Sequence, residues 1–334
     1  MPRRMQLSFI FGLVLSFVMA AARGAWAEEP LKIGYSDWPG YVAFEIAINK
    51  GWLKEAGVNA EFQWFDYSAS LDAFSASKLD GVLTTNGDTL VMGSGGAKGV
   101  MIMLTDYSNG NDMIVGKPEI KSLADLKGKK VGIEIGLVEH LLLLNGLKKA
   151  GIPEDSVTLV NTKTNETPQV FASGDVAAIG AWQPSSGMAI KAVPGSHPIY
   201  TSADEPGLIY DVLTVSPTSL NTRHADWEKL LKVWDRCVHY INDPATQADA
   251  VKIMSGRDGL TPDQYLPFLK GTHLIDLSEG QSVFKKADGF ASLYGSTEIA
   301  DAFNVKAAVY KDKQDVGSYI DPSLTESAKK MAAQ

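Results

Sequence analysis

The sequence predicts an α/β fold of two lobes, each a mostly parallel sheet flanked by helices, with a ligand cleft between them. Short apolar strands alternate with amphipathic helices over residues 31–104, and the alternation restarts after a charged connector at residues 117–130. A strand at residues 210–215 then returns the chain to the first sheet. Strands and helices in alternation form parallel sheets covered on both faces. The expected lobes are 28–112 with 213–334, and 113–212.

The N-terminal segment, residues 1–27, is predicted to be a signal peptide. Arg3 and Arg4 precede an apolar run at residues 7–22, and Ala25-Trp26-Ala27 has the small-x-small pattern of a cleavage site. The run is shorter than the roughly 20 residues that span a bilayer. We therefore expect cleavage after Ala27 and a periplasmic protein, exported by general secretion or by the twin-arginine route. Loss of the three arginines of this segment takes the formal net charge from −8 to −11.

The first lobe is predicted from successive strand and helix patterns. Residues 31–35 form an apolar strand that Pro39-Gly40 ends, and an amphipathic helix over residues 41–56 has Gly57 at its C-cap position. The further elements expected here are a strand at 60–65, a helix at 68–77, a strand at 81–85, a helix starting at Gly87-Asp88 and a strand at 100–104.

The second lobe repeats this pattern, and a helical region follows it. The expected elements are a strand at 131–135, a helix at 138–150, a strand at 157–161, a helix at 167–173 and a strand at 177–181. From Asp226 onward the chain is expected to be mostly helical. Trp227, Trp234 and Val238 recur at helical spacing, which is typical of a stripe that faces the core. Cys237 lies in that stripe and is interpreted as a buried, inert thiol.

Composition and motifs exclude several classes of function. The chain of 334 residues has 39 acidic and 31 basic side chains and no basic run, so no nucleic-acid partner is expected. Its single cysteine excludes an intrachain disulfide and a site with several cysteine ligands. His140 has no second His or Cys at metal-ligand spacing. Without a nucleophile elbow, phosphate loop or dinucleotide fingerprint, we expect no enzyme, no catalytic residue, no metal and no cofactor.

Several motifs carry a resemblance to a known family over almost the whole chain after residue 27. They are Lys32-Ile-Gly-Tyr-Ser-Asp-Trp-Pro-Gly-Tyr41, residues 49–57 with Lys50-Gly-Trp-Leu-Lys54, and the segments 72–81, 122–131, 173–178 and 182–184. In order and spacing these resemble periplasmic solute-binding proteins of ABC importers, of the nitrate/sulfonate/bicarbonate/taurine type. The resemblance implies a type II periplasmic-binding fold that closes by hinge motion around a small solute. It also implies a cognate ABC permease as partner, and we expect a monomer.

The residues at the expected cleft indicate the charge of the solute. Ligands of open α/β sheets lie at the carboxyl ends of strands. The segments there carry no Lys or Arg but eight acids: Asp37, Asp88, Asp106, Asp112, Glu134, Glu139, Glu166 and Asp211. They also carry aromatic residues: Tyr35, Trp38, Tyr41, Tyr107, Trp182 and Tyr210. Carboxylates with aromatic faces suit a cation, and a planar guanidinium fits both.

Ten residues are therefore predicted to bind the ligand: Asp37, Trp38, Tyr41, Asn86, Asp88, Glu139, Glu166, Trp182, Gln183 and Asp211. Asp88 and Glu166 equally fit the first turn of a helix, where an acid caps free amides or meets the helix dipole. Asp106 and Asp112 lie near the expected hinge and fit either solvated side chains or ligand contacts. The chain also resembles the branch of the family linked to urea/guanidine carboxylase gene clusters, which implies a nitrogen-rich solute such as guanidine or urea.

Three alternatives stay open. One is an anion (nitrate, bicarbonate or an alkanesulfonate such as taurine) bound by amides and hydroxyls. Another is a thiamine-pyrimidine-like heterocycle stacked on Trp38 or Trp182. The third is an enzyme of thiamine-pyrimidine synthesis, which relatives of this fold include; the predicted export signal and the lack of a metal cluster oppose it. The leading hypothesis is a binding protein for nitrogen uptake that captures guanidinium or urea.

Overall fold

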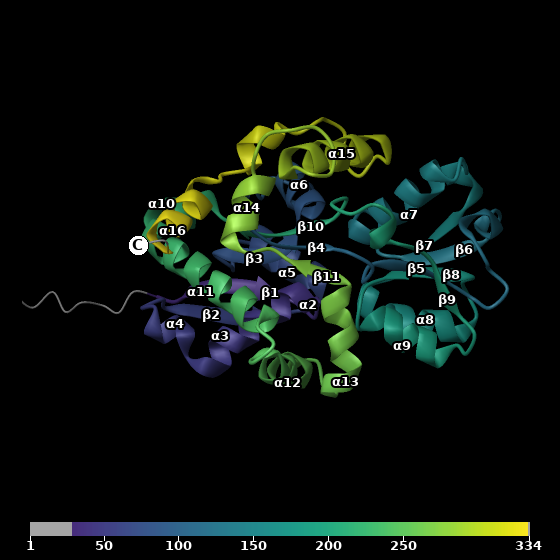
Figure 1. Cartoon of the computed structure of the whole chain (residues 1–334). Helices are drawn as coiled ribbons and strands as arrows, with labels where there is room; N and C mark the ends of the chain where they lie inside the picture. The colour runs from purple at the N-terminus through teal and green to yellow at the C-terminus, as the bar shows by residue number, and fades with distance from the viewer. Residues whose placement is uncertain (1–28, 333–334) are drawn as a thin grey trace, which may run out of the picture. The chain divides into compact units, whose positions relative to one another are not determined.

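The computed structural model describes residues 29–332, and residues 31 onward form two β-sheets flanked by helices (Figure 1). The predicted signal peptide, residues 1–27, lies outside the described residues. Within the described part of the chain, no helix is long and apolar enough to cross a membrane.

The first sheet has six strands in the order β11-β4-β10-β3-β1-β2. Their bounds are β1 Leu31–Tyr35, β2 Ala60–Trp64, β3 Gly81–Thr85, β4 Val100–Ser108, β10 Tyr210–Val215 and β11 Thr272–Leu274. β1 pairs in parallel with β2 and β3, whereas β10 lies antiparallel between β3 and β4. The ends of β1, β3 and β4 therefore share one edge with the start of β10, where Asp211 is paired with Thr85 on one side and Asp106 on the other.

The second sheet has five strands in the order β7-β6-β8-β5-β9. Their bounds are β5 Met113–Gly116, β6 Lys130–Ile133, β7 Thr158–Asn161, β8 Ala178–Ala181 and β9 His197–Thr201. β6 pairs in parallel with β7 and β8, and β5 lies antiparallel to β8 and β9. Met113, which opens β5, is paired with Ala181, which closes β8. The residue before β5 and the residue after β8 therefore lie at the same edge.

The chain passes between the sheets twice, at residues 109–112 and 202–209. Hydrogen bonds tie the two crossings together: the Oγ atoms of Ser108 and Ser202 are 2.6 Å apart, and the amide of Ser202 donates to the carbonyl oxygen of Asp112 over 2.9 Å. All strands of the second sheet lie within residues 113–201. The expected lobe boundaries themselves remain a prediction.

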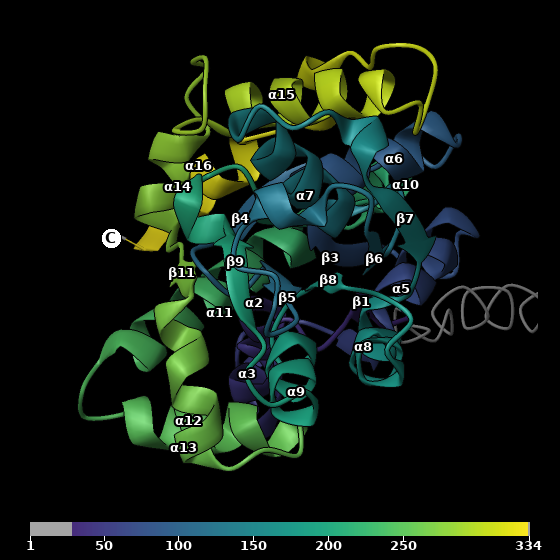
Figure 2. The same ribbon diagram turned by 90° about the vertical axis from the view of Figure 1, so that its right-hand side faces the viewer.

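Helices cover both faces of each sheet. In the second lobe, α7 (Val138–Lys149) packs on one face, and α8 (Thr167–Ser173) and α9 (Ser185–Ala192) pack together on the other (Figure 2). The other α-helices after β2 are α5 Tyr67–Ser75, α6 Asn86–Ser94, α10 Pro217–Thr222, α11 His224–Asn242, α12 Gln247–Arg257, α13 Pro262–Tyr265, α14 Leu277–Val283, α15 Leu293–Lys306 and α16 Ser323–Ala332. α11 buries Trp227 and Trp234, and the ring of Trp234 lies 5.0 Å from that of Phe44.

Three parts of the fold differ from the sequence prediction. The helix expected at residues 41–56 is three short helices, α2 (Pro39–Val42), α3 (Phe44–Lys50) and α4 (Trp52–Glu55), because Gly51 adopts a left-handed conformation (φ 71°) that stops α3. β4 runs to Ser108 rather than ending at Leu104. The antiparallel strands β5, β9 and β11 were not expected, because each is short and lacks the strand–helix alternation that marks the parallel ones.

Candidate functional site

A small pocket, here called the inner pocket, lies where the strand edges of the two sheets meet. Its cavity volume is about 10 Å³, roughly the space that one water molecule needs, so a larger solute requires the surrounding side chains or the lobes to move apart. The lining residues come from both lobes and from the crossings: Trp38, Tyr41, Tyr67, Thr85, Asp112, Val138, Trp182, Ile209 and Asp211. No Lys or Arg is among them, so the lining brings two acids and no fixed positive charge.

Aromatic rings form most of the wall. Trp38, Tyr41, Tyr67 and Trp182 are all buried, and the rings of Tyr67 and Trp182 pack edge to face with centroids 5.1 Å apart. Since Tyr67 follows β2 and Trp182 follows β8, this ring pair joins the two lobes across the pocket. The π faces favour a flat or cationic ligand.

The polar end of each ring donates a hydrogen bond to a carboxylate. These four bonds run from Trp38 Nε1 to Asp106 (2.9 Å), from Tyr41 Oη to Asp211, from Tyr67 Oη to Asp88 (2.6 Å) and from Trp182 Nε1 to Asp37 (3.1 Å). An indole N–H or a phenol O–H has only one proton to donate. The aromatic wall therefore has no donor left for a ligand.

One glycine allows the first of these contacts. A Cβ atom on Gly40, in α2, would lie 1.9 Å from Oδ2 of Asp106 and 2.9 Å from Nε1 of Trp38. Only a residue without a side chain lets α2 approach the carboxyl group this closely. Gly40 thus positions Trp38 and Asp106 behind the pocket.

Asp106 and Asp211 form the first of two carboxyl pairs. They are neighbours across β4 and β10, both are buried, and the carboxyl group of each acts on the pKa of the other. Burial raises the pKa of Asp106 to about 7. Burial, together with the charge of Asp106, raises the pKa of Asp211 well above its usual range. Asp211 lines the pocket and Asp106 lies behind it.

Asp112 and Glu139 form the second pair. Asp112 lies in the crossing before β5, and Glu139 is fully buried in the first turn of α7. The carboxyl groups of this pair also act on each other's pKa. Burial raises the pKa of Asp112 to about 6 and that of Glu139 well above its usual range. Asp112 lines the pocket, whereas Glu139 lies behind it against Gly180, whose missing side chain leaves it room.

Asp88 occupies a position that would otherwise attract an anion. The N-terminus of α7 points its amides toward the pocket, and such a terminus favours negative charge. The amide of Val138 donates to the Asp88 carboxylate, which also accepts from Tyr67. Burial raises the pKa of Asp88 to about 7. The chain therefore supplies its own carboxylate to this helix end.

The residues predicted from sequence fall into three groups. Four line the inner pocket: Trp38, Tyr41, Trp182 and Asp211. Two others accept hydrogen bonds from lining residues, namely Asp37 and Asp88, and Glu139 lies behind the lining residue Asp112. The remaining three lie elsewhere, namely Asn86, Glu166 and Gln183. Asn86 donates to the hydroxyls of Ser296 and Thr297, Gln183 accepts from the amide of Gly187, and Glu166 is exposed at the start of α8.

Sequence reasoning left out five lining residues: Tyr67, Thr85, Asp112, Val138 and Ile209. Tyr67 opens α5 three residues after the end of β2, so it lies near a strand end and the rule that selected the other segments could have found it. Asp112 was considered together with Asp106 but was not among the predicted contacts. Val138 and Ile209 carry no polar group, so nothing in the sequence marks them.

A second space, here called the outer pocket, adjoins the inner one. It has a cavity volume of about 50 Å³ and shares Tyr67 and Trp182 with the inner pocket. Its other lining residues are Asp37, Trp64, Phe65, Asp66, Ser68, Glu134, Lys163, Thr164 and Asn165. The Trp182–Asp37 hydrogen bond, which joins the lobes, therefore lies at the boundary between the two spaces.

The carboxylates are not arranged as a metal site. Among the described residues, no group of three or more His, Cys, Asp or Glu side chains could hold one ion. His140 accepts a hydrogen bond at Nδ1 from the amide of Gly136, and burial lowers its pKa. The acids are spread around the space, as suits a ligand with several N–H groups.

Comparison with known proteins gives a family and a fold. A family model described as NMT1/THI5 like matches residues 38–247. A Brucella abortus (strain 2308) protein, named only as a binding protein, is 31% identical over 206 residues, which cover 61% of this chain and 62% of that protein. An arginine-binding extracellular protein of Bacillus subtilis (strain 168) is 31% identical over 109 residues, which cover 32% of this chain and 40% of that protein. The chain thus spans less than two thirds of the length of these curated relatives.

A solved structure extends the similarity to the whole fold. The alkanesulfonate-binding protein of Xanthomonas axonopodis pv. citri has a TM-score of 0.72 at 16% identity, covering 89% of this chain and 100% of that chain. At this identity the likeness shows the fold alone. It confirms the expected two-lobed periplasmic-binding-protein fold with a sheet in each lobe.

Proposed function

The chain belongs to the NMT1/THI5-like family, and from that premise we propose that it is the substrate-binding component of an ABC importer. The names of the Brucella and Xanthomonas proteins, both binding proteins, support this role. The predicted signal peptide supports a periplasmic location, and a cognate permease would receive the closed, loaded form. Closure of the two lobes over the inner pocket is the expected way to retain the solute.

The proposed ligand is a small nitrogen-rich cation, and guanidinium fits best. One observation carries this choice: at the inner pocket the donors are occupied, whereas acceptors remain open. Oδ2 of Asp112 and Oδ2 of Asp211 are buried without a hydrogen-bond partner in the described structure. A buried carboxylate needs donors or a positive charge. Guanidinium offers both, because it has only N–H donors and a flat face for the aromatic wall.

An anion fits this pocket poorly. Nitrate or a sulfonate would need free N–H or O–H groups, but the wall's donors are bonded to carboxylates and the amide of Val138 is bonded to Asp88. It would also lie beside Asp112 and Asp211, and like charges at close range repel strongly in a buried site. The sulfonate ligand in the name of the Xanthomonas protein is therefore not transferred to this chain.

Urea is the second candidate within the nitrogen-rich class. It has the shape of guanidinium and four N–H groups, but its carbonyl oxygen needs a donor. At this pocket that donor would be an acid proton, and the free carboxylate charge would stay uncompensated. A thiamine-pyrimidine-like ring meets the same difficulty at its ring nitrogens. The arginine named as ligand of the Bacillus protein carries a guanidinium group, which supports the cation.

Calorimetric titration of the purified chain tests the ligand. Guanidinium, urea, nitrate and taurine are titrated separately at equal ionic strength and at concentrations far below denaturing ones. Saturable binding of guanidinium, much weaker binding of urea and no heat from the two anion-type ligands are expected. Saturable binding of nitrate or taurine without a response to guanidinium would overturn the cation assignment. Recovery of unchanged guanidinium after long incubation separates binding from catalysis.

A further inference from the structure

The two acids that line the inner pocket are each backed by another acid that does not line it. Asp211 is backed by Asp106, and Asp112 is backed by Glu139. In both pairs the carboxyl group of each acid acts on the pKa of the other. The first pair lies on the first sheet and the second joins a crossing to α7, yet their arrangement is the same.

Each pair holds two acceptors face to face with no donor between them. Oδ2 of Asp106, Oδ2 of Asp211, Oδ2 of Asp112 and both carboxyl oxygens of Glu139 are buried without a partner in the described structure. Two carboxylates in contact cannot both be ionised in a buried site, so a pair in contact shares a proton. In the absence of a ligand, that proton is the only positive charge within the pair.

The groups around the two pairs cannot supply the positive charge that each pair lacks. Asp88 faces Glu139, and Asp112 faces Asp106 and Asp211 across the pocket. Tyr41 and Trp38 donate to the first pair without adding charge. The buried tyrosines Tyr67 and Tyr265, which lie nearby, are neutral at physiological pH. No Lys or Arg acts on either pair among the described residues.

We propose that Asp106 and Glu139 are positioning residues that share a proton with Asp211 and Asp112, and that a cation entering the inner pocket displaces these protons to solvent. This inference rests on the proposed function, because it requires a cationic ligand. The balance is simple: the ligand enters with its charge, each pair that ionises fully gives one proton to the buffer, and no bond to the ligand is made. About one proton is released for each cation bound, because one positive charge replaces another and the charge of the pocket stays the same.

Two consequences distinguish this mechanism from simple charge attraction. Affinity for guanidinium falls as the medium becomes more acidic, by up to about tenfold per pH unit for each proton released. A neutral ligand of the same shape, urea, releases no proton, so its affinity stays flat over the same range. The acid pairs would therefore select for charge and not only for shape.

The first test counts protons during binding. Guanidinium is titrated at neutral pH in buffers of different ionisation enthalpy, and the slope of the observed heat gives the number of protons released. Wild-type protein is expected to release about one. Glu139→Gln, which keeps the shape and cannot share an acidic proton, is expected to release fewer, and Asp106→Asn likewise. Glu119→Gln, an exposed acid of the same lobe, is the control and should match the wild type.

The second test detects the shared protons directly, first in the free protein and then with guanidinium added. The infrared spectrum of the free protein at neutral pH is expected to contain the carbonyl band of protonated carboxylic acids, weakened in Glu139→Gln and Asp106→Asn and lost when guanidinium is added. Guanidinium binding with no proton release would overturn this inference and leave the proposed function standing. A protonated-acid band without guanidinium binding would overturn the proposed function and keep the shared protons. Absence of the band from the free protein would refute the shared protons in either case.

Discussion

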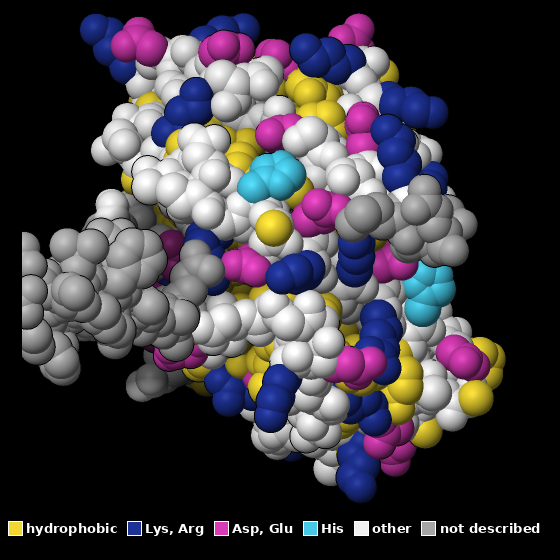
Figure 3. Space-filling model, turned by 90° about the vertical axis from the view of Figure 1, so that its left-hand side faces the viewer, with side chains coloured by type: hydrophobic (Ala, Val, Ile, Leu, Met, Phe, Trp, Pro, Cys, Tyr) yellow, Lys and Arg dark blue, Asp and Glu magenta, His cyan; other side chains and the backbone are white. Residues whose placement is uncertain are grey.

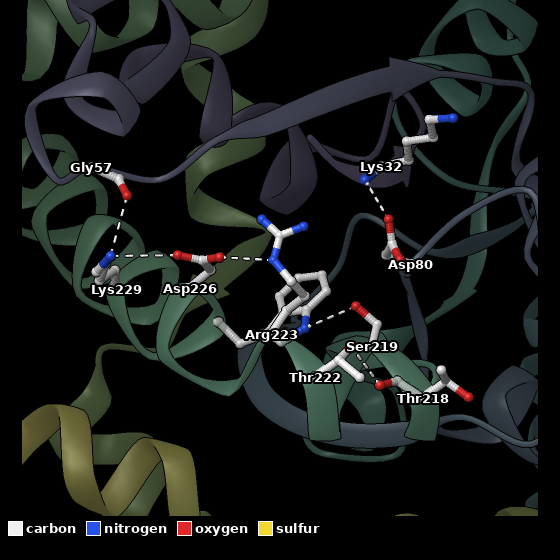
Figure 4. A network of polar contacts seen from close by, with 10 residues as sticks. Lys32, Gly57, Asp80, Thr218, Ser219, Thr222, Arg223, Asp226 and Lys229 are labelled. Atoms are coloured by element: carbon white, nitrogen blue, oxygen red, sulfur yellow. Dashed lines mark hydrogen bonds and ion pairs between the residues drawn. The ribbon is translucent and has the colours of Figure 1, made fainter. Parts of the chain in front are cut away.

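Two regions of this protein use the same residue type in opposite ways. On α11, Asp226 lies between two cations: Nε of Arg223 at 2.9 Å and Nζ of Lys229 at 3.4 Å, and Lys229 also donates to the carbonyl of Gly57 (Figure 4). At the inner pocket, Asp112 and Asp211 have acids as neighbours and no base. The α11 carboxylate is neutralised by the chain itself, whereas the pocket leaves that role to a proton or a ligand.

The surface follows the pattern of α11. On the face drawn in Figure 3, Lys and Arg side chains lie interspersed with Asp and Glu side chains. Such pairs are weak individually but leave little uncompensated charge. The buried acids around the inner pocket, in contrast, have no Lys or Arg acting on them among the described residues. The charge of the ligand is therefore inferred from where the acids lie, and not from the formal net charge of −8.

The largest expected effect comes from exchanging one acid in each region. Asp211→Asn removes a carboxylate that lines the pocket, and loss of one partner of a buried charge pair costs about 2–5 kcal/mol, or roughly 30- to 5,000-fold in affinity. Asp226→Asn changes the same chemical group on α11. Calorimetry with guanidinium should show the loss in the first variant and wild-type affinity in the second. Equal effects in both variants would mean that the comparison has no bearing on binding.

The next effect tests the geometry behind the pocket. Gly40→Ala places a methyl group where Oδ2 of Asp106 now lies, so α2 or the carboxyl group has to move. Overpacking of this kind costs typically 1–3 kcal/mol. Guanidinium affinity should fall because Trp38 and the Asp106–Asp211 pair are displaced together. Gly256→Ala, on an open part of α12, is the matched control and should bind normally. Normal binding by Gly40→Ala would show that guanidinium binding does not need the close contact between α2 and the Asp106 carboxyl group.

The same contrast explains what could be predicted from the sequence. The Arg223–Asp226–Lys229 contacts follow from i, i+3 spacing on one helix, and the parallel strands follow from alternating patterns. The rule of strand ends also placed Trp38, Trp182 and Asp211 at the cleft. All of these depend on local order along the chain.

The carboxyl pairs could not be predicted in this way. Asp106 meets Asp211 through the antiparallel register of β4 and β10, and Asp112 meets Glu139 through the unexpected strand β5. No local pattern gives a contact between residues that far apart. Asn86 is a residue that the strand-end rule selected although it does not line the pocket. Its side chain donates hydrogen bonds to Ser296 and Thr297 of α15, a contact that no local pattern in the sequence predicts.

A third effect is on stability without ligand. The pKa of Asp106 is about 7 in the folded protein, raised by burial above its ordinary value. Because the folded state holds this proton more tightly, its contribution to stability is complete below the ordinary pKa near 4 and is lost as the pH rises from there to about 7, at up to about 1.4 kcal/mol per pH unit. The Tm of the free protein should therefore fall from about pH 4 to about pH 7, and this contribution should add no further fall at higher pH. Asp106→Asn should flatten this fall and Asp226→Asn should not; an unchanged slope in Asp106→Asn would contradict the assignment.

A smaller effect is expected from the aromatic wall. Trp182→Leu keeps an apolar side chain but removes the π face and the hydrogen bond to Asp37. A cation–π contact is worth roughly 0.5–2 kcal/mol, so guanidinium affinity should fall about 2- to 30-fold. Trp182→Phe, which restores a ring without the N–H group, should recover part of the loss. If both variants bind alike, the ring face contributes nothing and the carboxylates alone hold the cation.

The smallest effect belongs to the α11 network itself. Lys229→Ala leaves Asp226 paired with Arg223, so one of its two cations remains. Surface pairs of this kind contribute about 0.2–1 kcal/mol and are screened by salt. The free energy of unfolding should change by no more than that in low salt and hardly at all in high salt, with guanidinium affinity unchanged throughout. A large, salt-independent loss would mean that the α11 carboxylate depends on its base as the pocket acids depend on their proton, and the distinction between the two regions would be lost.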